Sequence, residues 1–242
     1  MPLLLLIGRG AACEALQRAA EKLGVHVESL PAGAAGGEPG RTNLAGARTL
    51  LSQADTVIFT DTNHPETWRL RLRETVCAER RVIPGPESWR DLWNSPTQCF
   101  WLRRHGLPAV ATQTTQSTAD GASPASAPAN SFILPLLRTS RGEHFNLPQK
   151  LFPCSRAFQP ASMQPGPRRR AMAIAHCLAQ AIASPGVFAA EFLIQPEESV
   201  LISRVLSFPW LVEHSSNPGT RDALAQIHLN AILDYPLPLS IE

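Results

Sequence analysis

Few side chains in this 242-residue sequence stand at spacings that could carry chemistry. The turn Gly8-Arg9-Gly10 follows an apolar run, and a glycine turn before a helix can hold a phosphate on backbone N–H groups. A strand-to-helix connection requires the same turn, so Gly8 and Gly10 are a candidate cofactor site with a purely structural alternative. His214 beside Glu213 could act as a general base. No pattern pairs this histidine with a nucleophile or a metal, so we assign no catalytic residue.

The cysteines do not suggest a metal site. Their number is odd, and none stand in a C-x-x-C pair, whereas structural zinc sites use closely spaced ligand pairs. His176 and Cys177 are adjacent on a predicted helix and therefore point to different faces. We expect buried or idle thiols, no metal and no cofactor. The cysteines are Cys13, Cys77, Cys99, Cys154 and Cys177.

Composition and charge narrow the class of protein. The chain is 44% hydrophobic and 17% charged, as in a folded globular protein, and its net charge of +2 provides little attraction for nucleic acid. The basic run Arg168–Arg170 is expected to be a solvated helix face. Only two of the 22 basic residues are lysines, which weakens mechanisms that grip phosphate with several lysines. The apolar run Leu3–Ile7 is far shorter than the ~20 residues of a membrane span, so a cytoplasmic location is expected.

Hydrophobic periodicity predicts alternating strands and helices in the first third of the chain. Such alternation is typical of a parallel sheet with helices on both faces, which is an α/β fold. The predicted strands are Leu3–Ile7, Val25–Leu30, Thr56–Thr60 and Arg81–Ile83, and the predicted helices are Ala11–Leu23, Asn43–Leu51, Glu66–Glu79 and Pro96–His105.

A polar segment then divides the chain. Residues 111–131 contain no large apolar side chain and are predicted to be a low-complexity linker between domains at 1–110 and 132–242. The second domain is predicted to contain strands at Phe132–Leu137, Val187–Ile194 and Val200–Val205, with helices at Arg169–Ala183 and Thr220–Leu233.

Several segments, in this order, resemble the ATP-grasp enzyme family of carboxyaminoimidazole ribonucleotide synthases. Leu6–Gly10 resembles the family's opening strand and glycine loop, Gly186–Phe192 its strand with the first metal-binding glutamate, and His228–Pro238 its tail. The resemblance implies a Rossmann-like, pre-ATP-grasp N-terminal sheet packed on an ATP-grasp C-terminal subdomain. It also implies a homodimer and an ATP-dependent carboxylation of an aminoimidazole ribotide.

The sequence departs from this family where the family binds ATP. The central ATP-grasp subdomain, with its lysine and phosphate loop, would lie between Val110 and Phe132, where only the polar linker stands. The family's second metal ligand belongs to an Asn-Glu pair, which corresponds here to Ser203 and Arg204. Of the family's signature Pro-Arg-x-His-Asn-Ser-Gly-His, only His214 is kept.

Two candidate sites follow from these departures. Glu191 keeps the position of the first metal ligand, but we expect it to pair with Arg204, because a carboxylate buried alone is costly. A stretch that is charged in the family is apolar here, with Phe208, Trp210 and Leu211. They either fill the core or form a patch that binds a protein partner.

The sequence therefore predicts a non-catalytic pseudoenzyme that acts as a binding or scaffold protein, without Mg-ATP bound in the family manner. Two alternatives stay open: residual carboxylase activity in the purine pathway, and a sensor for a nucleotide-like ligand or ribotide at the carboxyl ends of the first strands.

Overall fold

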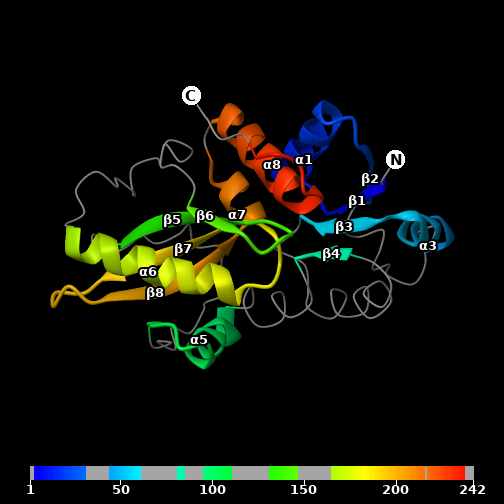
Figure 1. Cartoon of the computed structure of the whole chain (residues 1–242). Coiled ribbons are helices and arrows are strands. Elements are labelled where there is room, and N and C mark those ends of the chain that lie inside the picture. The colour runs from blue at the N-terminus through cyan, green and yellow to red at the C-terminus, as the bar shows by residue number, and fades with distance from the viewer. Residues whose placement is uncertain are drawn as a thin grey trace.

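The computed structural model describes residues 3–30, 44–60, 81–84, 95–110, 131–146, 165–215 and 217–237, which form two four-stranded sheets lying end to end (Figure 1). The predicted helix Glu66–Glu79 and the predicted linker, apart from Ser131, lie outside these residues. The boundaries of the three predicted segments therefore stay a prediction.

The first sheet is parallel, as the alternating pattern predicts. Its strands are β1 (Leu3–Ile7), β2 (His26–Leu30), β3 (Thr56–Phe59) and β4 (Arg81–Ile83), in the order β2-β1-β3-β4. Strand β1 is an unbroken aliphatic run because it is buried on both faces. Leu4 and Leu6 pack with helix α1 (Ala11–Lys22), and Leu5 and Ile7 lie in a second cluster beside helix α3 (Leu44–Gln53).

The second sheet is antiparallel. Its strands are β5 (Ser131–Arg138), β6 (His144–Asn146), β7 (Gly186–Ile194) and β8 (Val200–Ser207), in the order β6-β5-β7-β8. Helix α6 (Pro165–Ala181) covers one face, and helices α7 (Phe208–Glu213) and α8 (Pro218–Leu233) pack on the other (Figure 1). Strand β6 and helix α7 were not predicted from the sequence.

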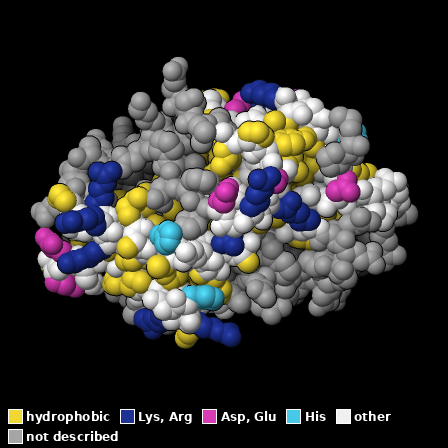
Figure 2. Space-filling model, viewed as in Figure 1, with side chains coloured by type: hydrophobic (Ala, Val, Ile, Leu, Met, Phe, Trp, Pro, Cys, Tyr) yellow, Lys and Arg dark blue, Asp and Glu magenta, His cyan; other side chains and the backbone are white. Residues whose placement is uncertain are grey.

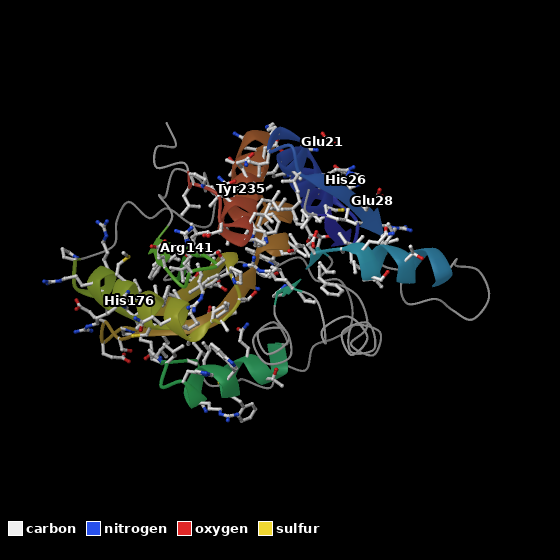
Figure 3. All side chains as sticks on the ribbon, turned by 45° about the vertical axis from the view of Figure 1, so that its right-hand side comes forward. Glu21, His26, Glu28, Arg141, His176 and Tyr235 are labelled. Atoms are coloured by element: carbon white, nitrogen blue, oxygen red, sulfur yellow. The ribbon has the colours of Figure 1, made fainter. Side chains whose placement is uncertain are left out.

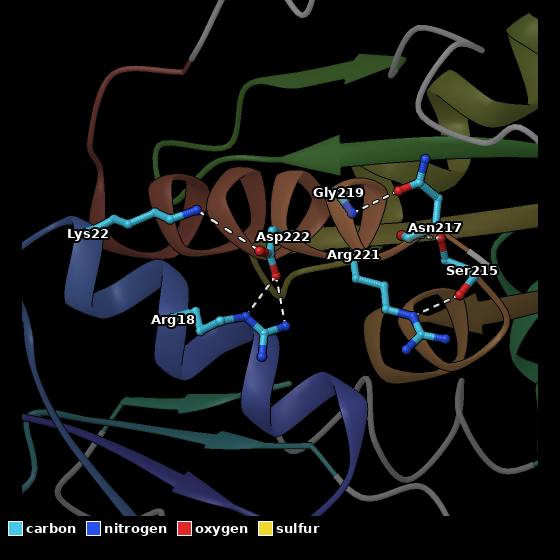
Figure 4. Close-up of polar contacts among 7 residues, drawn as sticks. All are labelled: Arg18, Lys22, Ser215, Asn217, Gly219, Arg221 and Asp222. Atoms are coloured by element: carbon cyan, nitrogen blue, oxygen red, sulfur yellow. Dashed lines mark hydrogen bonds and ion pairs between the residues drawn. The ribbon is translucent and has the colours of Figure 1, made fainter.

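A shared hydrophobic core joins the two sheets through α1 and α8. Alanines supply much of the α1 surface in this core, and short side chains let the two helices approach closely. At the rim, Asp222 of α8 accepts from Arg18 Nη2 at 2.8 Å and lies 4.0 Å from Lys22 Nζ (Figure 4). Asn217 caps α8 by accepting from Gly219 N at 2.8 Å. The N-terminal sheet is thus fixed to the C-terminal helices by packing, and the ion pairs of Asp222 lie at the edge of this contact.

Polar contacts hold two further segments on the second sheet. Gln98 of helix α5 (Ser95–Arg104) exchanges two hydrogen bonds with the backbone of Val205, which covers the edge of β8. Arg141, in the turn after β5, donates to Asp234 Oδ2 at 2.8 Å; Figure 3 shows it near the end of α8, where Tyr235 is labelled. These contacts bring the segments around 98 and 141 onto the same body as β8 and α8.

A buried histidine of α8 occupies the centre of this assembly. His228 Nδ1 accepts a hydrogen bond from Val187 N at 2.9 Å, so the neutral ring carries its proton on Nε2. Phe208 stacks on the imidazole at a centroid distance of 4.0 Å. Gly186 has φ +121°, and a Cβ built there would lie 2.5 Å from His228 Cε1. The β7–α8 contact therefore depends on a glycine at position 186.

Replacing Gly186 with alanine should destabilise the fold by several kcal/mol, since neither the backbone nor the buried ring has room to move. Gly24→Ala is the matched control, because Gly24 also has a positive φ (+67°) but no heavy atom lies within 4 Å of the point where a Cβ would stand. This control should lose only about 1 kcal/mol. Urea unfolding of both variants measures the difference, and equal losses would contradict the packing argument.

His228 should make the protein sensitive to acid. Burial lowers the pKa of His228 to about 3, whereas an unfolded histidine titrates near pH ~6.5. The neutral His228 ring therefore makes its full contribution to stability above pH ~6.5, and this contribution is lost as the pH falls toward the folded pKa. The free energy of unfolding should decrease by about 2 kcal/mol between pH ~7.5 and ~5. His228→Asn keeps an acceptor for Val187 N but cannot titrate. Unfolding free energies across this range should fall more steeply for the unaltered protein, and parallel pH curves would overturn the assignment.

Candidate functional site

Glu191 and Arg204 face each other about midway along β7 and the edge strand β8. They are register partners on β7 and β8, and Arg204 Nε donates to Glu191 Oε2. Only 4% of Glu191 is exposed, whereas 43% of the Arg204 side chain is exposed. The arginine thus neutralises a buried carboxylate, while part of its own side chain remains exposed. This is the ion pair that we expected from the sequence.

The pleat of the sheet determines which face carries this pair. The neighbouring register pair Ala189 and Leu206 packs into the core shared with α7 and α8, and side chains two residues apart share a face. A bulge follows Glu191, where Ser203 is the extra residue and its hydroxyl donates to Glu191 O at 3.2 Å. The pair therefore lies on the α7–α8 face, just beyond the shared core.

Two side chains of α7 and its end extend the site. Arg204 Cζ lies 5.4 Å from the ring centroid of Trp210, within the range of a cation–π contact. The ring of His214 stacks on Trp210 at 4.0 Å, and His214 Nδ1 lies 2.9 Å from Trp210 O. A carbonyl oxygen only accepts, so Nδ1 donates and carries the proton. The structure thus brings together Glu191, Arg204, Trp210 and His214, which the sequence separates by up to 23 positions.

The expectation of an exposed apolar patch is wrong for two of its three members. Phe208 and Leu211 are only 2% and 3% exposed and lie in the core shared by the two sheets. The reason is that α7 directly follows β8 and turns its apolar side toward α1 and α8. Trp210 is half-buried and is the one residue of the three at the surface. Phe208 and Leu211 therefore fill the core, which is the other interpretation that the sequence left open.

Gly8 and Gly10 form the connection between β1 and α1. Gly8 N donates to Leu30 O at 3.0 Å, and Gly10 O accepts from Glu14 N at 3.1 Å. Gly10 has φ +87°, a left-handed conformation that favours glycine. Burial raises the pKa of the Cys13 thiol in the first turn of α1, so this cysteine is not a reactive thiolate at neutral pH. The connection explains both glycines, and binding of a phosphate there stays a prediction.

A small cleft lies between the sheets, at the end of the first sheet where the sensor alternative places a ligand, but the residues of its lining were not predicted from the sequence. Its volume is about 30 Å³, and its lining is mainly apolar. The lining includes Ile58 of β3, Ile83 of β4 with the following Pro84, Gly186 of β7, Phe208 of α7 and His228 of α8. No local motif marks these residues, because they come from separate segments of the chain. The cleft lies at the carboxyl ends of β3 and β4, where open sheets commonly bind ligands.

Within the described ranges, neither the surface charge nor the grouping of metal-binding side chains indicates another site. Within them, no three His, Cys, Asp or Glu side chains cluster as metal ligands, and no helix is long and apolar enough to cross a membrane. Figure 2 shows positive and negative side chains interspersed over the described part of the face in view. Arg168, Arg169 and Arg170 are exposed, and Arg170 Nη1 donates to Glu198 O at 2.7 Å.

Comparison with known proteins identifies the fold. No protein-family model matches the sequence, and no curated protein matches it. Solved structures of N5-carboxyaminoimidazole ribonucleotide synthetases do match the structure. The Thermotoga maritima enzyme has a TM-score of 0.67 at 15% identity, over 98% of this chain and 77% of its own. The Aspergillus clavatus enzyme complexed with ATP gives 0.66 at 16%, over 98% and 78%.

The Staphylococcus aureus N5-carboxyaminoimidazole synthetase gives a TM-score of 0.67 at 15% identity, over 100% of this chain and 79% of its own. The chain therefore has the α/β fold of these ATP-grasp proteins, in agreement with the resemblance seen in the sequence. Part of each neighbour has no counterpart in this chain.

Replacing Arg204 with methionine should destabilise the protein, because Glu191 would remain buried without its cation. Breaking a fully buried pair costs about 3–5 kcal/mol, and the exposure of the arginine reduces the expected loss to about 1–3 kcal/mol. Adding Glu191→Gln to this variant should recover part of the loss. Arg103→Met, at an exposed arginine of α5, is the control and should change stability by less than about 0.5 kcal/mol. An unchanged Tm for Arg204→Met would count against the pair.

Proposed function

We propose that this protein is a non-catalytic relative of the ATP-grasp ligases, a pseudoenzyme that binds a partner or a small ligand without turning over Mg-ATP. The observation that carries the proposal is the contact of Arg204 Nε with Glu191 Oε2. In the family that the sequence resembles, metal ligands stand at these two positions. Here the second position is Arg204, and its cationic side chain is hydrogen-bonded to the carboxylate of Glu191 at the first position.

The chemistry of magnesium supports this interpretation. Mg²⁺ takes oxygen ligands, usually carboxylates together with the phosphates of the substrate. A guanidinium carries a fixed positive charge and offers only N–H donors, so it repels a metal ion and cannot coordinate one. Glu191 would have to exchange a charge-assisted hydrogen bond for a metal that stands beside an arginine. We infer that no working magnesium site forms at this pair.

The length of the chain also supports the proposal. The neighbouring synthetases are longer than the part that this chain covers. We propose that the uncovered part includes the central ATP-grasp subdomain, because residues 111–131 are polar and short where that subdomain would stand. Phosphoryl activation of bicarbonate depends on positioning and on charge at the phosphates. Without that subdomain and the metal, both would be lost. A homodimer is a further proposal, which follows from the resemblance.

A thermal-unfolding scan with and without Mg-ATP tests the proposal. A ligand at ~100 times its dissociation constant stabilises by about 2.7 kcal/mol, which would raise the Tm by about 5–11 °C for a chain of this size. We expect no such shift for the unaltered protein. In Arg204→Glu, two facing carboxylates should repel one another, and Mg²⁺ or Mn²⁺ alone should restore part of the lost stability.

A Tm shift of about 5 °C or more with Mg-ATP in the unaltered protein would contradict the proposal. So would growth of a purine auxotroph complemented by this chain, because growth requires turnover. Growth would favour residual carboxylase activity, whereas a Tm shift without growth would favour the nucleotide sensor.

A further inference from the structure

We infer that Arg204 is a metal-independent binding group for a small organic anion, a phosphate monoester or a carboxylate attached to an apolar body. The inference deepens the proposed function and rests on it, because it requires that Glu191 hold the arginine and not a metal.

The guanidinium is held in place but retains hydrogen-bonding capacity. Its Nε is bonded to Glu191 Oε2, and its Cζ lies over the ring of Trp210 at 5.4 Å. Among the described residues, the structure records no hydrogen bond from Nη1 or Nη2, and 43% of the side chain is exposed. An arginine fixed on one side therefore presents its outer N–H groups to the surface. Two such groups match the oxygens of a phosphate or carboxylate.

The neighbouring row of the sheet provides an apolar surface beside this cation. Ile133 is the register partner of Glu191 on β5, and the next row along the same face consists of Leu201, Leu193 and Ser131. These side chains are half-buried. Rows two residues apart along a strand are separated by about 7 Å, roughly the width of an aromatic ring. A ligand whose anionic group meets Arg204 could therefore rest its apolar body on Leu193 and Leu201.

An unsatisfied polar atom lies in the same row. The hydroxyl oxygen of Ser131 is buried and has no hydrogen-bond partner among the described residues. Buried polar atoms are nearly always paired, and an unpaired one requires an explanation. A polar substituent on the ligand body would satisfy it. The face thus offers a cation, an aromatic ring, an apolar row and one hydroxyl.

Glu191 then has the role of a positioning residue with a measurable signature. Its carboxylate fixes Nε, but its negative charge opposes any anion that approaches the same guanidinium. Glu191→Gln keeps an oxygen that can accept from Nε and removes that charge. An anion bound through Arg204 should therefore bind more tightly to this variant. An anion bound through a metal on Glu191 should bind less tightly, so the two modes predict opposite signs.

Isothermal titration with phenyl phosphate, in buffer containing EDTA, tests the inference. We expect binding to the unaltered protein that does not change when EDTA is replaced by Mg²⁺. Arg204→Lys retains the positive charge opposite Glu191 but lacks the planar guanidinium group with its paired N–H donors. This variant should bind phenyl phosphate at least 10-fold more weakly. Glu191→Gln should bind several-fold more tightly. Arg103→Lys, at an exposed arginine of α5, is the control and should match the unaltered protein. Inorganic phosphate in place of phenyl phosphate should bind more weakly, because it lacks the apolar body.

The outcomes separate this inference from the proposed function. Absence of phenyl phosphate binding, or equal binding by Arg204→Lys, overturns the inference and leaves the non-catalytic proposal standing. Binding that requires Mg²⁺ and disappears in Glu191→Gln overturns both, because it would show a metal at the carboxylate. A melting curve for each variant, recorded beforehand, establishes that the variant is folded.

Discussion

The packing of α1 against α8 is the contact on which the rest of the structure depends. Each sheet alone would leave one apolar surface open: the α1 face of the parallel sheet and the α7–α8 face of the antiparallel sheet. Both surfaces are buried in one core, in which alanines of α1 meet aliphatic side chains of α8. Hydrophobic burial of this kind is non-directional and large, whereas the ion pairs of Asp222 at its rim are exposed and contribute little.

Close packing around that core explains why its polar members are so constrained. His228 is accommodated there only as a neutral ring that accepts from Val187 N, and only because position 186 has no side chain. Burial lowers the pKa of this imidazole, because its charged form would lose its contact with water. Gly186, Val187 and His228 also form part of the lining of the small apolar cleft between the sheets.

Glu191 and Arg204 illustrate how a fold can hold a buried carboxylate with a charge from its own chain. A buried carboxylate needs a counter-charge, and either a divalent cation or a guanidinium can supply it. The guanidinium is part of the chain, so it stabilises the carboxylate permanently and needs no ligand. Its remaining N–H groups are the feature on which the proposed binding of an anion rests. The likeness to the synthetases at 15–16% identity concerns the fold alone, so the chemistry that we propose rests on these few side chains.

The sequence by itself determined the parallel sheet, the limits of most helices and the opposition of Glu191 to Arg204. Periodicity and glycine turns are local signals, and the family resemblance placed these two residues on neighbouring strands. Tertiary structure alone decided the burial of Phe208 and Leu211, because α7 is a six-residue helix whose direction depends on the core it meets. It also decided the roles of His228, Gly186 and Gln98, whose partners lie 41 or more positions away. Contacts of that kind arise from packing between whole elements, and no local pattern encodes them.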